Sequence, residues 1–450
     1  MSRFALYSKR VVTDQGIKAA TLIINQGKIE SLVLDPQMPP SDIPLQDVDD
    51  WVIMPGLIDS HVHINEPGRT EWEGFESATR AAAAGGVTTL IDMPLNSSPV
   101  TTSVDALNQK LQAAENKLHV NCGFYGGLIP GGYGDLEPLF QSGVFGIKAF
   151  LTHSGIDEFP NVQEKHLREA LPLLKKYDLP LLVHAELDLP NEGTQYLQQH
   201  PESYQAYLRS RPKEWEDRAI DMLIQLAEEF KHPIHVVHLS SAQSISTISR
   251  AQKNGFPITT ETCPHYLSFS AESIPDRATI FKCAPPIREK ENNEQLWQAL
   301  KEQVIEFIVT DHSPSPPAMK SLESGSFDEA WGGIAGLQFS LPAVWSQAKK
   351  RTMSVEDIAR LMSFNVAKFL KLDHKKGKLS PGYDADIVVW DPEERFEVKE
   401  EHIYHRHKLT PYAGLILNGV VKQTYVNGFK VYDQGTFSPA QGSVVLKSKE

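Results

Sequence analysis

The sequence predicts an α/β protein, a (β/α)8 TIM barrel with a small β-sandwich domain built from both chain ends. Within the 450 residues, eight apolar, strand-like runs alternate with helical patterns over ~260 residues, the size expected of such a barrel. The two chain ends share a different pattern, in which short β-rich runs are separated by Gly and Asn turns. A doubly wound open sheet is the structural alternative, but no Gly-x-Gly-x-x-Gly motif follows any of these runs.

The β-rich runs at the two ends define the smaller domain. Residues 20–24 precede a hairpin motif, and residues 423–431 contain an Asn-Gly turn. Because the two patterns are similar, we expect both ends to pack together around the segment between them. The predicted domains are the N-terminal part of the β-sandwich at residues 1–52, the barrel at residues 53–373, and the C-terminal part of the β-sandwich at residues 374–450.

The central segment supplies the barrel. Its eight strand-like runs end near His63, Met93, Gly127, Phe150, Glu186, Ser240, His265 and Ser313. Helical stretches lie between and after them, at residues 76–84, 163–177, 214–230, 242–253 and 351–372. In a barrel of this kind the C-terminal ends of the strands face the active site. Polar residues at those ends are therefore the candidates for chemistry.

Composition excludes several classes of function. Lys and Arg number 44 against 57 Asp and Glu, a net charge of −13, which argues against nucleic acid or an anionic membrane as the main partner. No run of 18 or more apolar residues occurs, so no membrane-spanning helix is expected. The three cysteines, Cys122, Cys263 and Cys283, show no Cys-x-x-Cys spacing, and the first residues lack a signal-peptide pattern. We therefore expect a cytoplasmic protein that acts on a small molecule.

His61 and His63 end the first predicted strand. Because alternate side chains of a strand point to one face, the two imidazoles can hold one metal ion or open a two-metal site. A chance pair is the alternative in a chain with 16 histidines. However, polar residues recur at or near the corresponding end of four further strands, which favours a shared site. These are Lys148, His184, His238 and Asp311.

Lys148 lies within the apolar fourth strand. An ammonium group is costly to bury, so we expect the pKa of this amine to fall and the amine to become nucleophilic. A neutral amine can react with carbon dioxide to give a carbamate, whose oxygens can bridge two cations. The alternative is a lysine whose head group reaches the rim of the barrel.

Asp311 can bind a metal and also take a proton from a metal-held water, whose pKa zinc lowers towards ~7. The same carboxylate can then pass the proton to a leaving nitrogen. His265 and His312 are expected near the mouth, where they would support the metal ligands. His235 precedes His238 by three residues and is expected to point to the opposite face of its strand.

This pattern resembles the amidohydrolase superfamily, and within it the cyclic amidohydrolases with a carbamylated lysine. The similarity runs over nearly the whole chain and includes residues 378–389, which are typical of the return to the β domain. It implies two divalent metal ions, expected to be Zn²⁺ although Co²⁺, Mn²⁺ or Fe²⁺ suit the same ligands. It also implies a bridging N6-carboxylysine at Lys148 and a homo-oligomer, expected to be a homotetramer. The implied metal ligands are His61, His63, Lys148, His184, His238 and Asp311.

Comparison with two members of this superfamily, the dihydroorotases and the allantoinases, indicates the kind of substrate. Dihydroorotases usually carry an arginine that clamps the substrate carboxylate at the position of Asn65. They also usually carry an asparagine at the position of Ala284 and a histidine at that of Ser315. A site without these groups suits a neutral ring, such as the hydantoin of allantoin, better than dihydroorotate. The segments that look like those of allantoinases are residues 65–75, 92–97 and 330–338.

The resemblance thus implies an allantoinase, which hydrolyses the cyclic amide bond of allantoin to give allantoate. A hydroxide bridging the two metals would attack the ring carbonyl, and Asp311 would be the catalytic residue that moves the proton. The alternatives are a dihydropyrimidinase or hydantoinase, and a dihydroorotase. A non-catalytic interaction protein of the same lineage would be expected to have lost ligands. The candidate substrate contacts are Asn96, Cys283 and Ser313.

Overall fold

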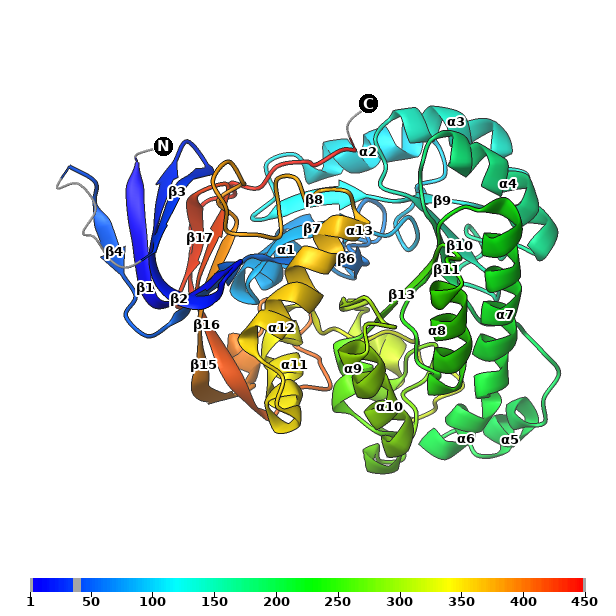
Figure 1. Cartoon of the computed structure of the whole chain (residues 1–450). Coiled ribbons are helices and arrows are strands. Elements are labelled where there is room, and N and C mark those ends of the chain that lie inside the picture. Colours follow the sequence, from blue (N-terminus) through cyan, green and yellow to red (C-terminus); the bar gives the residue numbers. More distant parts are fainter. Residues whose placement is uncertain (1–2, 35–41, 448–450) are drawn as a thin grey trace.

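Eight parallel strand positions form a barrel in the computed structural model, which describes residues 3–34 and 42–447 (Figure 1). The third position consists of two short strands, β8 and β9, which are separated by Tyr125, so nine strands occupy the eight positions. Val62 bridges to His312, which joins the first position to the segment after the last and closes the ring. The predicted barrel is therefore confirmed. Its strands are β6 (Leu57–Val62), β7 (Val87–Asp92), β8 (Asn121–Phe124), β9 (Gly126–Gly127), β10 (Ile147–Phe150), β11 (Leu181–His184), β12 (Ile234–Val236), β13 (Ile258–Thr262) and β14 (Phe307–Ile308).

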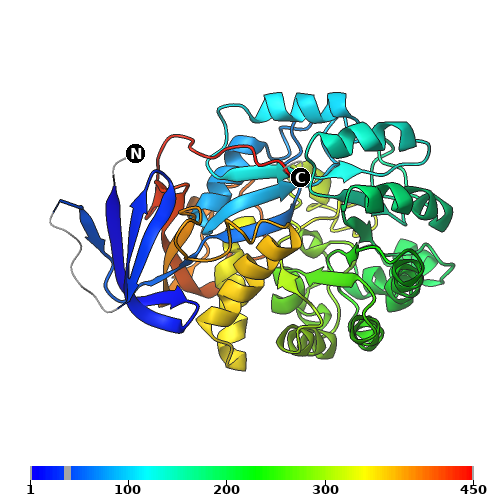
Figure 2. The same ribbon diagram turned by 45° about the horizontal axis from the view of Figure 1, so that its top comes forward.

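Helices cover the outside of the barrel (Figure 2). Helix α4 shows how the sequence produces this layer, since Leu167, Ala170, Leu171 and Leu174 recur at helical spacing and are buried. Within the described ranges, no helix combines the length and apolar character needed to cross a membrane. The longer helices are α1 (Phe75–Ala84), α2 (Val104–Ala114), α3 (Tyr133–Gln141), α4 (Glu164–Lys176), α7 (Lys213–Phe230), α8 (Ile245–Lys253), α10 (Lys290–Lys301) and α11 (Ser340–Ala348). The shorter ones are α5 (Gly193–Gln199), α6 (Tyr204–Ser210), α9 (Pro264–Ser268), α12 (Val355–Ala359) and α13 (Asn365–Phe369).

The seventh strand is shorter than predicted. β13 ends at Thr262, and Pro264 opens helix α9. Proline suits the first helical position because it lacks the N–H that would be unpaired there. His265, predicted at the strand end, lies in this helix instead. It is fully buried, and neither ring nitrogen has a hydrogen-bond partner in the part of the chain that the structure describes.

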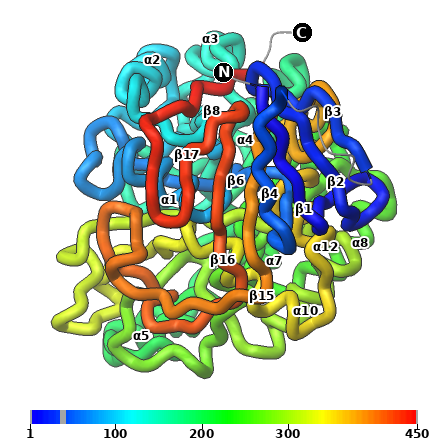
Figure 3. The backbone as a smooth tube through the Cα atoms, turned by 90° about the vertical axis from the view of Figure 1, so that its left-hand side faces the viewer, coloured from blue at the N-terminus to red at the C-terminus, as the bar shows by residue number. Residues whose placement is uncertain are grey.

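The two chain ends form one β domain, as predicted. Its nine-stranded sheet has the order β18-β17-β16-β15-β5-β1-β2-β3, with β4 paired to β1. Figure 3 shows the early and late strands side by side. The early strands are β1 (Phe4–Thr13), β2 (Gly16–Asn25), β3 (Lys28–Leu34), β4 (Leu45–Asp47) and β5 (Val52–Pro55). The late strands are β15 (Ile387–Glu397), β16 (Ile416–Val426), β17 (Phe429–Asp433) and β18 (Thr436–Phe437).

Gly56 separates the β domain from the barrel. Strand β5 belongs to the nine-stranded sheet, and β6 begins one residue later, at Leu57. A Cβ atom at Gly56 would lie 2.2 Å from Cγ2 of Thr88 on β7, so a larger residue would push the first two barrel strands apart. The boundary between the N-terminal part of the β domain and the barrel was predicted between residues 52 and 53; because β5 pairs within the nine-stranded sheet, we propose Gly56 as the boundary instead.

Candidate active site

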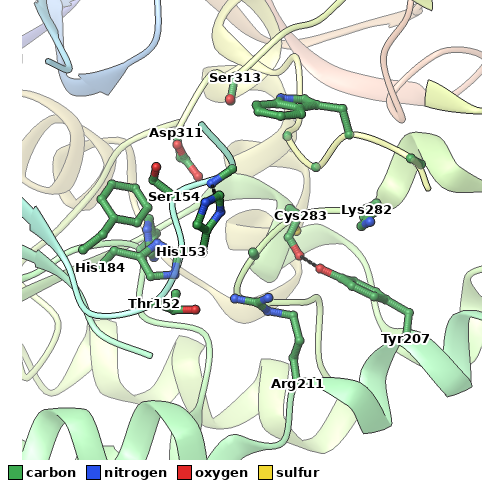
Figure 4. Close-up of a pocket in the computed structure, with 18 of the residues that line it drawn as sticks. Thr152, His153, Ser154, His184, Tyr207, Arg211, Lys282, Cys283, Asp311 and Ser313 are labelled. Carbon is green, nitrogen blue, oxygen red and sulfur yellow. Dashed lines mark hydrogen bonds between the residues drawn. The ribbon is translucent and has the colours of Figure 1, made fainter. Parts of the chain in front are cut away.

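A cavity of about 580 Å³ opens at the C-terminal ends of the barrel strands (Figure 4). This volume lies within the usual range for small-molecule sites. Of the predicted metal ligands and substrate contacts, all except Lys148 line the cavity. They are His61, His63, Asn96, His184, His238, Cys283, Asp311 and Ser313.

The first group of polar side chains lies around Asp311. The Nε2 atoms of His61 and His63 are each 3.3 Å from Oδ1 of Asp311. Their two-residue spacing therefore places both rings on one face, as predicted. His61, His238 and Asp311 also offer ligand atoms that all lie within 4.8 Å of one another. This arrangement is able to bind a metal ion.

His184 lies beside His238, next to the group around Asp311. Its ring centroid lies 4.6 Å from that of His238, and it stacks on Phe150 at an interplanar angle of 15°. Oε2 of Glu186 lies 2.7 Å from Nε2 of His184, and Arg211 also pairs with this carboxylate. Burial alone would raise the pKa of Glu186, but the charge of Arg211 and the contact with His184 outweigh it and lower the pKa. Glu186 is therefore a carboxylate that fixes the orientation of the His184 ring.

Lys148 is fully buried beside this cluster. Its Nζ has no hydrogen-bond partner in the described ranges and lies 5.0 Å from the ring centroid of Phe150. Burial lowers the pKa of Lys148 to about 7, against the opposing charges of Glu261 and Asp311. An unpaired buried amine is unfavourable, so the site fits a modification that gives this nitrogen new contacts. The alternative, a lysine whose head group reaches the barrel rim, does not hold, because Lys148 is fully buried.

Glu261 is a buried contact of the histidines that sequence reasoning missed. Its Oε1 lies 2.5 Å from Nδ1 of His61, and its Oε2 lies 3.1 Å from Nε2 of His235. The contact occupies Nδ1 of His61 and leaves Nε2 for a metal. Burial raises the pKa of Glu261 to about 8. The sequence did contain one indication of this role, namely a glutamate within the barrel strand Ile258–Thr262.

His235 was expected to face away from His238. In the structure its ring reaches Glu261, whose Oε1 also accepts a hydrogen bond from the backbone N–H of His238 at 3.3 Å. The expectation assumed a continuous strand, but β12 ends at Val236, and His238 has a φ of 40°. The two histidines therefore do not follow the alternation of one regular strand.

Replacing Glu261 by Gln should weaken metal binding by ~10–100-fold, the usual cost of removing a hydrogen-bond partner behind a ligand histidine. The variant keeps the size of the side chain but replaces one of the two oxygens that contact His61 and His235 with an NH2 group. Metal affinity would be measured by competition with a chelator. Glu306→Gln is the matched control, because Glu306 is half-buried and accepts its hydrogen bonds from Thr260 and Gln252. Equal losses in both variants would contradict an orienting role.

Two buried links join the first strand to the segment after the eighth. Oδ1 of Asp59 accepts hydrogen bonds from the backbone N–H groups of His61 at 3.1 Å and Thr310 at 3.2 Å. The carbonyl of His312 accepts one from the N–H of His63 at 2.8 Å. Burial raises the pKa of Asp59 to about 7. The links fix Asp311 relative to the histidine pair, and His312 supports them through its backbone.

Comparison with known proteins assigns the chain to a family. The model of the amidohydrolase family matches residues 52–431. The chain belongs to the amidohydrolase family. This is a metal-dependent family, which agrees with the cluster of His61, His238 and Asp311.

Individual relatives are similar over nearly the whole amidohydrolase chain. An allantoinase of Streptomyces avermitilis is 44% identical, over 98% of this chain and 98% of the relative. An allantoinase of Arabidopsis thaliana is 44% identical, over 98% of this chain and 90% of the relative. Among solved structures, the L-hydantoinase from Arthrobacter aurescens has a TM-score of 0.91 at 29% identity, covering 99% of this chain and all of the other. The dihydropyrimidinase from Brevibacillus agri has a TM-score of 0.90 at 25% identity, covering all of both chains.

Several polar residues of this amidohydrolase follow its barrel strands in an unusual backbone conformation. The φ angles are 40° at His238, 46° at Asp311, and 67° at both Asn65 and Asn96. Positive φ costs ~1–3 kcal/mol at such residues and persists where the surroundings impose it, commonly at functional sites. The energy stored at these positions supports a functional role for this end of the barrel.

The two asparagines singled out in the sequence have different positions. Asn96 lines the cavity, and its Nδ2 lies 3.4 Å from Nδ1 of His63. Asn65 is absent from the described lining of the cavity, and its Nδ2 donates to the carbonyl of Pro314 at 3.3 Å. Asn65 therefore does not face the cavity but holds the loop that carries Ser313, which does.

Sequence reasoning also missed the far wall of the cavity. This wall is built from loops and from the short helix α6, which have no regular spacing in the sequence. Its polar residues include Thr152, Asp188, Tyr207, Arg211 and Lys282.

Proposed function

We propose that this amidohydrolase opens the five-membered ring of allantoin to give allantoate. The observation that carries the proposal is the similarity to allantoinases, at 44% identity over 98% of the chain for the relatives from Streptomyces avermitilis and Arabidopsis thaliana. The solved hydantoinase and dihydropyrimidinase structures are less similar in sequence, at 29% and 25% identity. They support hydrolysis of a cyclic amide in general.

We further propose that the site holds two divalent metal ions, with zinc as the expected metal. The donor set supports this, because histidine nitrogens, an aspartate and a carbamate are all suitable zinc ligands. The unpaired buried amine of Lys148 supports its conversion to N6-carboxylysine. The proposed ligands are His61, His63, Lys148, His184, His238 and Asp311. When bound, such ions lower the pKa of a water molecule and polarise the ring carbonyl.

Asp311 is the proposed proton carrier. Its Oδ1 lies between the Nε2 atoms of His61 and His63, and its side chain lines the cavity. The carboxylate accepts a proton from the attacking water and later delivers it to the departing ring nitrogen. Glu186 and Glu261 hold the rings of His184 and His61, so these donors need little reorganisation during the reaction.

Asn96, Cys283 and Ser313 are the proposed contacts of the substrate ring. All three line the cavity. The carbonyl of Cys283 accepts a hydrogen bond from the hydroxyl of Tyr207 at 2.7 Å, which fixes this segment of the wall. A Cβ atom at Gly333 would lie 2.2 Å from the carbonyl oxygen of Ser313, so the close packing of the two segments requires glycine.

The cellular context is proposed as well. Cys122, Cys263 and Cys283 are all buried and unpaired, which supports a reducing compartment such as the cytoplasm. The assembly is proposed to be a homo-oligomer, with a homotetramer as the expected form. Light scattering on the purified protein at several concentrations would measure the mass of the assembly, and a mass of one subunit would contradict the tetramer.

The substrate proposal is tested by a matched assay of the metal-loaded protein. We expect kcat/KM to be clearly higher for allantoin than for dihydroorotate or dihydrouracil, because the groups that clamp a carboxylate in dihydroorotases are replaced by Asn65, Ala284 and Ser315. Ring opening would be followed by the appearance of the product. A preference for dihydrouracil would instead assign the chain as a dihydropyrimidinase, and a preference for dihydroorotate as a dihydroorotase.

A further inference from the structure

The wall of the cavity formed by Arg211 and Lys282 has no direct contact with the reacting amide in the chemistry proposed above. Both residues line the cavity, together with Tyr207. In the view of Figure 4 the guanidinium of Arg211 lies between Thr152 and Tyr207, on the side opposite Ser313. Neither cation is a candidate metal ligand, so both are available to a part of the substrate other than the reacting amide.

Arg211 is held in a fixed orientation. Its Nε and Nη2 donate to the two carboxylate oxygens of Glu186, at 3.1 and 2.5 Å. Its Nη1 has no hydrogen-bond partner among the residues that the structure describes. A guanidinium clamped on one edge presents its remaining N–H groups in a defined direction, so little entropy is lost when a ligand binds to them.

Lys282 also has N–H donors that are not used in hydrogen bonds with the described residues. Its Nζ lies 5.4 Å from the ring centroid of Tyr207, and in the described ranges its hydrogen bond is a long one, 3.4 Å to the carbonyl of Asp328. An ammonium group has three N–H donors, so at least two are not used. Burial and the neighbouring charge of Arg211 lower the pKa of Lys282 to about 8, so the amine is still mainly protonated at neutral pH.

The wall carries acceptors as well as donors. Asp188 accepts a hydrogen bond from the hydroxyl of Thr152, and both residues line the cavity. Asp328 and Glu329 line it too. Because Glu186 already neutralises Arg211, these carboxylates disfavour an anionic substituent. A neutral urea group suits the wall better, since its carbonyl oxygen accepts hydrogen bonds and its N–H groups donate them.

We propose that Arg211 and Lys282 bind the ureido substituent of allantoin, donating hydrogen bonds to its carbonyl oxygen, while Asp188 accepts from its N–H groups. The inference rests on the proposed function and adds the residues that select the substituent. Ring opening takes place at the histidine and aspartate cluster, whereas this wall distinguishes allantoin from hydantoins that lack the ureido group.

The test compares two substrates that share the reacting ring, allantoin and unsubstituted hydantoin. Lys282→Met should lower kcat/KM for allantoin by about tenfold to hundredfold, the loss expected for a hydrogen bond to a charged group. It should leave kcat/KM for hydantoin nearly unchanged. Lys282→Arg should recover part of the loss, because it restores a charged donor. Lys213→Met is the matched control, since Lys213 lies near Arg211 in the sequence but pairs with Glu289 and is absent from the described cavity lining.

Three results would overturn the inference. Equal losses for allantoin and hydantoin in Lys282→Met would show that Lys282 supports the site as a whole. A wild-type preference for hydantoin-5-acetate over allantoin would show that the wall binds a carboxylate. If the wild-type protein opens hydantoin but not allantoin, the proposed function fails as well, and this is seen before any variant is tested. Thermal unfolding of each variant would show that the protein remains folded.

Discussion

Lys148→Ala should abolish ring opening and lower the metal content of the purified protein. Lys148 would hold the metal ions directly through its carbamate oxygens, so its loss should exceed the ~10–100-fold effect of losing an outer hydrogen-bond partner. Metal would be counted by elemental analysis, and activity would be assayed with and without added short carboxylic acids. Partial recovery with such an acid, which can take the place of the carbamate, is the expected outcome. Activity that survives without one would contradict the carbamate.

A second variant, Lys148→Met, tests whether Lys148 also stabilises the fold of the metal-free protein. Nζ of Lys148 is buried without a hydrogen-bond partner in the described ranges. Lys148→Met replaces it with an apolar side chain of similar length, so the free energy of unfolding should stay the same or rise. Denaturant unfolding of the metal-free proteins measures this. A large loss of stability would mean that Lys148 supports the barrel core itself.

Asp311→Asn should lower kcat by ~10²–10⁴-fold, the usual contribution of a positioned proton carrier. An amide keeps the shape of the side chain and an oxygen that can face a metal, but it cannot accept the proton of the attacking water. Steady-state kinetics and metal content should be measured on the same preparation. Asp105→Asn is the control, because Asp105 is an exposed residue in the first turn of helix α2. If kcat falls only in proportion to lost metal, Asp311 is a ligand and not the proton carrier.

The positions of the strand-end residues could be predicted because strands impose a strict spacing. The two-residue spacing predicted that His61, in β6, and His63, just after its end, point the same way, and both lie 3.3 Å from Oδ1 of Asp311. The apolar surroundings of Lys148 in the sequence indicated that its pKa falls, and burial lowers it to about 7. These predictions needed only the local backbone and the C-terminal ends of the strands.

The remainder of the site depends on contacts distant in sequence. Glu261 reaches His61 across the barrel, 200 residues away, and nothing in its own strand indicates that partner. Arg211 follows helix α6 and faces the cavity because Glu186 holds it. The seventh strand was predicted too long because its apolar run continues into a helix begun by Pro264. Such errors arise where tertiary packing, and not spacing, decides the conformation.

The position of β5 has a consequence for biosynthesis. This strand pairs with β1 on one side and with β15 on the other, and after Gly56 it leads directly into β6, which contains His61 and is followed by His63. β1 is synthesised before β5, whereas β15 is synthesised only after the whole barrel. Because such long-range pairing forms late, β5 keeps an open edge on the nascent chain. Strand β6 thus gains its full support from the sheet only after β15 has been synthesised.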